Sequence, residues 1–292
     1  MLTLNDPGLL KTDAFINGKF VPAKTDARFV VTNPANGQNI AEVADFGADG
    51  IAAAIDAAEA AGPAWAARTA KDRAGILRRW YDLCIEHADD LAAILTAEMG
   101  KPLAEAKGEI LYGSSFVEWF AEEAKRISGD VLESPFPDKK FLVLKQPVGV
   151  FGAITPWNFP LAMITRKVAP AIAAGCPVVV KPSEYTPLTA LALARLADGL
   201  LPPGVLNVIP ASRANAQPVG EVLCDSDVVR ALSFTGSTAV GKLLMSQASS
   251  TVKKVSLEVG APPLPALLAG CLKNTTHAPD DRPVYKTEVA ET

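Results

Sequence analysis

The stretch PVVVKPSEYTPLTALALARLADGLLPPGVLNVI, residues 177–209, contains the pattern that decides the fold. Its β-branched run at 177–181 precedes a helical segment at 187–200 and a second apolar run at 204–209. The same alternation continues on both sides, with strand-like runs at 141–155, 229–235 and 253–259 and helical segments at 161–174, 215–224 and 238–248. Repeated alternation of strand and helix predicts an α/β fold, with a parallel sheet and helices on both of its faces.

The carboxyl edge of this predicted sheet is where a ligand is expected. In open parallel sheets of the Rossmann-like kind, ligands bind beyond the carboxyl ends of the strands. The rule selects residues 155–158, residues 181–184, and Gly236 with Ser237, because each set directly follows a strand-like run. We therefore look for functional residues in these three places.

The N-terminal third is expected to be mostly helical after an initial hairpin. Asn17-Gly18 separates two short runs within 15–32, and both residues tolerate the positive φ of a tight hairpin turn. An alanine-rich helix is predicted at 51–65. Thr69 and Asp72 then form a capping box that opens the next helix.

A glycine and a proline mark the following helix boundary. Gly100 is expected to end one helix, and Pro102 suits the first position of the next. Residues 103–127 should bury one face, because apolar residues recur at helical spacing: Ile110, Val117, Phe120, Ala124 and Ile127.

Composition divides the chain into three parts. Residues 1–140 are expected to form a hairpin and helices that pack on an α/β core at 141–260. Residues 261–292 contain five prolines and no sustained period, so we expect them to form a disordered tail.

Overall composition argues against several classes of protein. The chain has 292 residues, is 49% hydrophobic and has a formal net charge of −4 without a Lys/Arg cluster, which disfavours nucleic-acid binding. No leader segment is recognised, and no apolar run approaches the ~20 residues that span a bilayer, so we expect a cytoplasmic protein. Four cysteines lack CxxC or His/Cys spacing, so neither zinc nor disulfides are expected: Cys84, Cys176, Cys224 and Cys271.

The segment FTGSTAVG, residues 234–241, has the form of a phosphate-binding turn. A strand runs into Gly236 and Ser237 and then opens a helix, whose N–H groups and dipole would accept a pyrophosphate. The spacing between Gly236 and Gly241 is neither GxGxxG nor a Walker motif. The same turn is also explained by close packing of a helix against a strand.

The segment KPSE, residues 181–184, places a cation and a carboxylate at the same predicted edge. Glu184 could accept hydrogen bonds from both ribose hydroxyls of an adenosine, with Lys181 beside it. A carboxylate there would repel a 2′-phosphate, which favours NAD over NADP. The alternative is a solvated lysine and a glutamate in the first turn of the next helix.

Two further polar residues stand at strand ends. Asn158 lies between two prolines in PWNFP, where a rigid amide could donate to a developing oxyanion. Glu258 lies in an apolar strand end, where burial should raise its pKa and suit it to act as a general base. Their alternatives are an ordinary asparagine turn and a solvated glutamate.

Together the motifs ITPWNFP, KPSE, SFTGSTAVGK and VSLEVG resemble the aldehyde dehydrogenase superfamily, over roughly residues 12–260. The stretches GKPLAEAKGEI and PWNFPLAMITRKVAPAIAAGC look like those of succinate-semialdehyde dehydrogenases. The resemblance implies NAD-dependent oxidation of an aldehyde to an acid in a homo-oligomer, with residues 141–260 as the dinucleotide-binding core.

The resemblance also implies a role for each matching residue. Asn158 would be the oxyanion donor, Glu258 the base that activates water, and Arg166 the partner of a distal substrate carboxylate. Arg166 has an alternative as a salt-bridged helix residue. Cofactor-binding roles fall on Trp157, Lys181, Ser183, Glu184, Gly236, Ser237 and Gly241.

The family mechanism also needs a cysteine thiolate, in a motif like Gly-Gln-x-Cys beyond the glutamate. The sequence departs from the family at Ala261, and Cys271 in AGCLKN does not match the motif. Most of the substrate domain and the C-terminal assembly strand are expected to be missing. We therefore expect the chain alone to be inactive; the alternatives are a non-catalytic module that binds NAD or a sister subunit, and a non-functional fragment.

Overall fold

A seven-stranded sheet lies at the centre of the structure, a computed structural model that describes residues 2–260. Its strand order is β11-β10-β7-β8-β9-β1-β2. Five neighbouring strands are parallel: β7 (Val150–Ile154), β8 (Val178–Lys181), β9 (Leu206–Val208), β10 (Val229–Gly236) and β11 (Lys254–Val259). The predicted tail at 261–292, with Cys271, lies outside the described residues.

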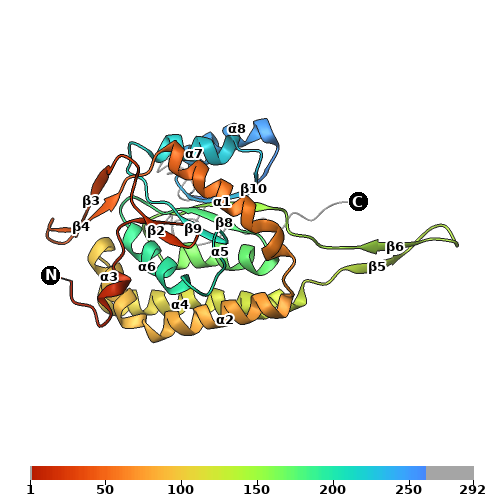
Figure 1. Cartoon of the computed structure of the whole chain (residues 1–292), viewed down its shortest axis with the longest axis horizontal. Coiled ribbons are helices and arrows are strands. Elements are labelled where there is room, and N and C mark those ends of the chain that lie inside the picture. Colours follow the sequence, from red (N-terminus) through yellow and green to blue (C-terminus); the bar gives the residue numbers. More distant parts are fainter. Residues whose placement is uncertain (1, 261–292) are drawn as a thin grey trace, which may run out of the picture.

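Helices cover both faces of this sheet, as the strand–helix alternation predicts (Figure 1). One face is covered by α1 (Ala48–Ala66), α7 (Ala216–Asp225) and α8 (Thr238–Ala248). The other is covered by α5 (Ala162–Ala174) and α6 (Pro187–Ala197), and a further layer consists of α2 (Ala70–Glu86), α3 (Ala88–Met99) and α4 (Leu103–Glu123). The predicted α/β class is confirmed.

Two apolar layers hold the helices to the sheet. The larger layer joins the sheet to α2–α6 and the smaller joins it to α1, α7 and α8. Two buried tryptophans also donate across the larger layer: Trp65 Nε1 to the Ile172 carbonyl at 3.1 Å and Trp80 Nε1 to the Leu193 carbonyl at 3.2 Å. Burying a polar indole without such a partner would cost free energy, so these bonds fix how α1 and α2 lie against α5 and α6.

The predicted N-terminal hairpin is present and extends the sheet. β1 (Ala14–Ile16) and β2 (Lys19–Val21) pair antiparallel around Asn17 and Gly18, whose φ angles are 51° and 73°. β1 also pairs with β9, so N-terminal residues complete the same sheet as the α/β core. A separate pair, β3 (Arg28–Thr32) and β4 (Asn39–Ala44), follows it.

The helix boundaries follow the predicted caps with two differences. The Thr69 hydroxyl accepts the Asp72 N–H at 3.2 Å, and Gly100 ends α3 with a φ of 85°. Pro102 precedes the first helical residue instead of occupying that position. Ile127 is 42% exposed, so its predicted burial is wrong, because α4 ends at Glu123 before a short 3-10 turn.

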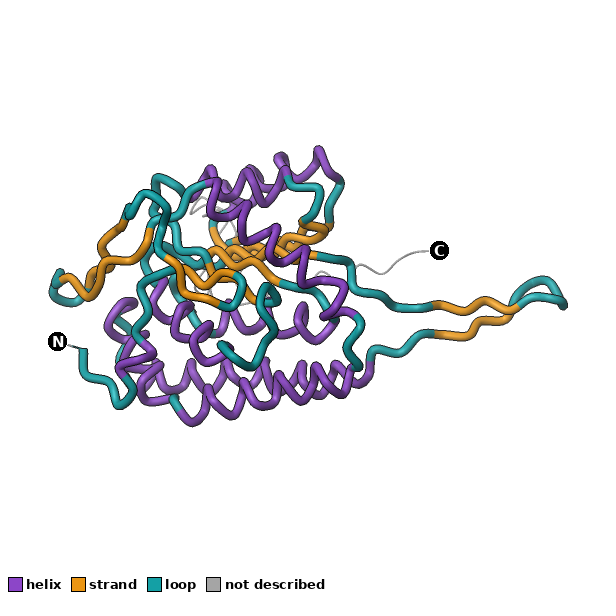
Figure 2. The backbone as a smooth tube through the Cα atoms, viewed as in Figure 1, coloured by secondary structure: helices purple, strands orange, loops and turns teal. Residues whose placement is uncertain are grey.

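The strand-like run at 141–155 is divided between two places. β6 (Lys140–Val143) pairs with β5 (Asp130–Glu133) in a hairpin that Figure 2 shows extending away from the helices and the sheet. The chain enters the sheet only at β7, after Gly149 with a φ of 119°. The strand-like run therefore contains two strands, β6 and β7, and the hairpin leaves Val131 and Leu142 69% and 68% exposed.

Chain order reverses between two neighbouring strands of the sheet. From β7 the chain continues to β8 and β9 on one side, and it returns to β10 and β11 on the other side. Such a reversal opens a crevice at the carboxyl ends of the two central strands, and this is where α/β sheets bind ligands. Among residues 2–260 no helix is long and apolar enough to cross a membrane.

Candidate active site

The predicted site residues lie at the carboxyl ends of four adjacent strands. Asn158 follows β7, and Ser237 follows β10. Lys181 is the last residue of β8, and Glu184 lies three residues after it. Glu258 lies near the end of β11. The reversal between β7 and β10 therefore lies in the middle of the set. Strand order, which the sequence alone does not reveal, brings these segments together.

The N-terminus of α8 is open towards this edge. Ser237 caps the helix, and its side-chain oxygen accepts the Val240 N–H at 3.4 Å. Gly241 N–H donates to the Ser237 carbonyl at 3.0 Å. Within residues 2–260, the N–H groups of Thr238 and Ala239 have no hydrogen-bond partner, so together with the helix dipole they can bind an anion.

At both glycines of this turn a side chain would force a neighbouring side chain to shift. A Cβ on Gly241 would lie 2.7 Å from Val259 Cγ1, and one on Gly236 would lie 2.5 Å from Phe234 Cζ. Phe234 belongs to the same strand as Gly236, so the alternative explanation of the motif, close approach of a helix to a strand, accounts only for Gly241 of α8 against Val259 of β11. Close packing does not account for the N–H groups of Thr238 and Ala239 at the N-terminus of α8, which remain able to bind an anion.

Lys181 and Glu184 are brought together at the end of β8. Their side chains lie 3.6 Å apart at Nζ and Oε2, and Lys181 is only 5% exposed. Burial lowers the pKa of Lys181, and the neighbouring Glu184 opposes that shift. Ser183 accepts the Tyr185 N–H at 3.2 Å and shapes the turn. Lys181 is thus not the solvated lysine of the alternative interpretation.

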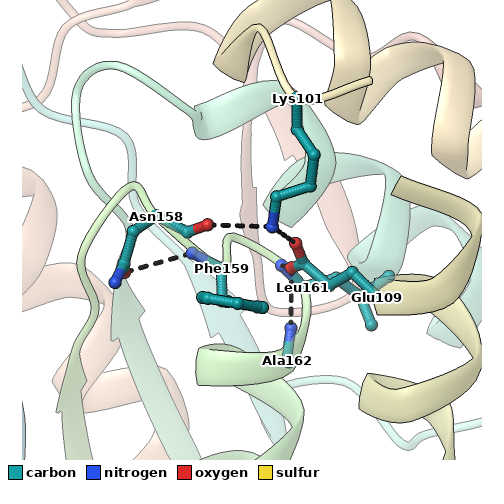
Figure 3. A network of polar contacts seen from close by, with 6 residues as sticks. All are labelled: Lys101, Glu109, Asn158, Phe159, Leu161 and Ala162. Atoms are coloured by element: carbon teal, nitrogen blue, oxygen red, sulfur yellow. Dashed lines mark hydrogen bonds and ion pairs between the residues drawn. The ribbon is translucent and has the colours of Figure 1, made fainter. Parts of the chain in front are cut away.

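The Asn158 side chain is half-buried after β7, and one of its two polar atoms has no partner among residues 2–260. Its Oδ1 accepts the Phe159 N–H at 3.1 Å, and its carbonyl accepts a hydrogen bond from Lys101 Nζ at 3.1 Å (Figure 3). In residues 2–260 the amide nitrogen has no partner and can donate to a ligand. Trp157, beside it, is 48% exposed.

Glu258 is surrounded by hydrogen-bond donors and cations. Its Oε2 accepts the Thr235 hydroxyl at 2.6 Å and lies 3.3 Å from Lys167 Nζ, while its Oε1 lies 3.8 Å from Arg166. Burial alone would raise the pKa of Glu258, but Lys167, the Thr235 hydroxyl and Arg166 together hold it below its usual value. The predicted raised pKa is therefore wrong, because β10 and α5 supply more stabilisation of the charge than burial removes.

Lys167 is a member of this group that the sequence patterns did not reveal. It is 4% exposed, donates to the Ser233 hydroxyl at 2.9 Å, and has a pKa lowered by burial. The available signal was a lysine beside Ile164, Val168 and Ala171, which make one face of α5 apolar. Arg166 beside it lies against Glu258 and the Phe116 ring.

Cysteines in the described part of the chain are poor nucleophiles. Cys84, Cys176 and Cys224 are all buried. Burial raises the pKa of Cys84 to about 12 and that of Cys224 to about 11, which keeps both as thiols. Residues 2–260 also contain no group of three or more His, Cys, Asp or Glu side chains that could hold a metal ion.

Comparison with known proteins gives a single family. Residues 20–263 match the aldehyde dehydrogenase family. The chain is 55% identical over 260 residues to the succinate-semialdehyde dehydrogenase [NADP(+)] GabD of Escherichia coli (strain K12), covering 89% of this chain and 53% of the relative. It is 54% identical over 261 residues to the 3-sulfolactaldehyde dehydrogenase of Pseudomonas putida, covering 89% and 53%. The mitochondrial succinate-semialdehyde dehydrogenase of Homo sapiens is 54% identical over 253 residues, covering 86% and 47%.

Solved structures give the same result. An aldehyde dehydrogenase from Brucella melitensis biovar abortus 2308 superposes with a TM-score of 0.87 at 54% identity, covering 89% of this chain and 54% of that one. The betaine aldehyde dehydrogenase of Staphylococcus aureus in complex with NAD+ superposes with a TM-score of 0.83 at 34% identity, covering 86% and 50%. The chain spans about half the length of the curated relatives and solved structures it matches.

Proposed function

The chain belongs to the aldehyde dehydrogenase family, and we propose that it supplies the cofactor-binding part of an NAD-dependent oxidation of a small acidic aldehyde. One observation supports this most strongly. An open helix end, a Lys–Glu pair, a free amide and an ion-paired carboxylate follow four adjacent strands, around the point where strand order reverses. These are the groups needed to bind a dinucleotide and an aldehyde side by side.

The cofactor assignment follows from the donors and acceptors at this edge. The N-terminus of α8 after Ser237 would bind the diphosphate, and Lys181 with Glu184 would bind the adenosine ribose. Ser183, Gly236 and Gly241 shape the two turns, and Trp157 would line the cleft. When bound, NAD accepts a hydride from the substrate carbon.

Preference for NAD rests on Glu184. Its carboxylate would repel a 2′-phosphate, although the relative from Escherichia coli is named for NADP(+) and the Staphylococcus aureus structure holds NAD+. We expect the chain to bind NAD at least about tenfold more tightly than NADP, a difference of ~1.4 kcal/mol. Calorimetry should show that Glu184→Ser narrows this gap; equal binding of both cofactors by the parent chain would refute the assignment.

The catalytic roles follow from the free atoms of Asn158 and Glu258. The Asn158 amide nitrogen would donate to the oxygen of the aldehyde as negative charge develops there. Glu258 Oε2 is engaged by Thr235 and Lys167, so Oε1, 3.8 Å from Arg166, is the oxygen that can take a proton from water. Its lowered pKa keeps Glu258 ionised at neutral pH, ready to accept that proton but a weaker base.

The substrate class follows from Arg166 and from the relatives. The relatives from Escherichia coli and Pseudomonas putida are named for succinate semialdehyde and 3-sulfolactaldehyde, each an aldehyde with an acidic group. Arg166 is a guanidinium beside Glu258 and the only residue we assign to that acidic group.

The reaction also needs a thiolate, and the buried cysteines of residues 2–260 do not provide one. We therefore expect the chain alone to show no aldehyde-dependent turnover, and its alternative role is a module that binds NAD or a sister subunit. Absorbance at the reduced cofactor's band, with succinate semialdehyde as substrate, measures this. Robust turnover that Cys271→Ser abolishes would overturn the expectation and identify the nucleophile.

Assembly and location are further parts of the proposal. The exposed apolar residues of the β5–β6 hairpin, Val131 and Leu142 among them, suit pairing with another subunit, as in a homo-oligomeric family. Neither nucleic acid nor membrane is proposed as a partner. A cytoplasmic location is proposed from composition, although several relatives are named as mitochondrial.

A further inference from the structure

The turn that carries Asn158 is contacted on both sides by one buried ion pair (Figure 3). Lys101 Nζ lies 2.7 Å from Glu109 Oε2, and the two side chains are 8% and 1% exposed. The Lys101 ammonium also donates to the Asn158 carbonyl at 3.1 Å. The other oxygen of Glu109 accepts the N–H groups of Leu161 at 2.9 Å and Ala162 at 3.3 Å.

The two members of the pair come from a distant part of the chain. Lys101 lies between α3 and α4, where Gly100 turns the chain with a φ of 85°, and a Cβ on Gly100 would lie 2.8 Å from Pro34 Cγ. Glu109 lies in the early part of α4. The helix boundary at Gly100 therefore delivers Lys101 to the turn, and α4 delivers Glu109.

Stability alone is a weak explanation for burying these charges. Removing two charges from water is costly, and apolar residues of similar volume often stabilise a protein as well or better. What the pair supplies here is directed hydrogen bonds to the main chain. A third contact adds to them, because the Lys101 ammonium lies 3.7 Å from the centroid of the Phe159 ring.

The orientation of the Asn158 side chain depends on this main chain. Asn158 Oδ1 accepts the Phe159 N–H at 3.1 Å, which directs the amide nitrogen away from the turn. Any rotation of the peptide between Asn158 and Phe159 would move both the acceptor of Lys101 and the donor to Oδ1. The ion pair and the amide orientation are therefore linked through one peptide group.

We propose that Lys101 and Glu109 are positioning residues for Asn158. They fix the turn at the Asn158 carbonyl and at the first N–H groups of α5, and so hold the amide nitrogen in one direction at the ligand edge. The inference rests on the proposed function only for the role of Asn158 as oxyanion donor.

The test observes the Asn158 side chain directly in the full chain. Selective ¹⁵N labelling of asparagine gives one pair of NH₂ signals per residue, and Asn158→Asp identifies the Asn158 pair by its loss. The informative variant is Lys101→Met combined with Glu109→Gln. The double variant removes both charges, so no buried charge is left without a partner, and glutamine keeps an acceptor for the Leu161 and Ala162 N–H groups.

The controls separate positioning from a general loosening of the helices. Glu98→Gln alters another buried carboxylate, which accepts the N–H groups of Leu188 and Thr189 at the start of α6, both at 2.7 Å. Lys101→Arg keeps a charged donor at the Asn158 carbonyl. We expect the double variant to shift and broaden the Asn158 signals, and both controls to leave them near their parent positions.

Unchanged Asn158 signals in the double variant, or an equal shift in Glu98→Gln, would overturn the inference. If the double variant fails to fold, Glu109→Gln alone is measured instead; an intermediate shift supports the inference and no shift overturns it. Calorimetry with NAD on the parent chain tests the proposed function independently. If the parent chain does not bind NAD but the double variant shows the expected NMR shifts, the proposed function is refuted and the positioning role of Lys101 and Glu109 still holds.

Discussion

Helices α5 and α6 lie on the same face of the sheet, and each begins against a buried carboxylate from the N-terminal helices. Glu109 meets the start of α5 and is paired with Lys101 at 2.7 Å. Glu98 meets the start of α6 with two short bonds, and has no ion pair among residues 2–260. Burial, with a smaller contribution from the nearby Glu109, raises the pKa of Glu98 to about 8.

The difference shows what the cation adds. Both carboxylates satisfy N–H groups that a helix leaves without partners in its first turn. Only the carboxylate at α5 also brings a cation to the turn that carries a site residue, Asn158. The turn before α6 also carries predicted site residues, Ser183 and Glu184, but the cation there is Lys181 of β8, 3.6 Å from Glu184, and not a partner of Glu98.

The largest expected effect comes from breaking the pair at α5. Lys101→Met leaves the Glu109 carboxylate buried without its cation, which should cost about 3–5 kcal/mol of unfolding free energy. Chemical denaturation measures it. The matched control is Lys107→Met, whose exposed partner Asp89 lies 2.7 Å away, with an expected cost of ~0–1 kcal/mol. Equal losses in the two variants would contradict this reading of the buried pair.

A smaller, pH-dependent effect is expected at α6. The pKa of Glu98 is higher in the folded state, so between about pH 4.5 and about pH 8 this carboxyl group binds more protons in the folded state than in the unfolded state. The contribution of Glu98 to the free energy of unfolding therefore falls as pH rises through this window. Glu98→Gln lacks the contribution. Its unfolding free energy relative to the parent should therefore increase across that window, by up to a few kcal/mol, in denaturation at a series of pH values. A difference that stays constant or decreases would show that Glu98 does not titrate this way.

The smallest effect concerns the aromatic contact of Lys101. Phe159→Leu removes the ring that lies 3.7 Å from the ammonium but keeps an apolar side chain and the ion pair. We expect a loss of about 1 kcal/mol, the usual size of a cation–π contact together with a small change in packing. Thermal unfolding beside the parent measures it. A loss as large as that of Lys101→Met would mean that the ring, and not the ion pair, holds the turn.

Much of the fold could be predicted because its signals are local. The alternation around 177–209 predicted the parallel sheet and its covering helices, and Asn17-Gly18, Thr69 and Gly100 marked turns and caps. Each signal depends on neighbours within one or two turns of chain. Local signals failed at 141–155, because an exposed hairpin strand and a buried sheet strand have similar apolar sequences.

The sequence by itself determined which segments carry site residues, because the residues after each strand can be identified once the strands are known. Only the tertiary structure decided how those residues affect one another. Placing β10 next to β7, and α5 beneath them, brings Lys167 and Arg166 to Glu258 and reverses the expected direction of its pKa shift. Packing of α4 on α5 likewise brings Glu109 to the turn of Asn158. The physical reason is that secondary structure follows from short-range periodicity, whereas charge pairing depends on distances in space between segments far apart in the chain.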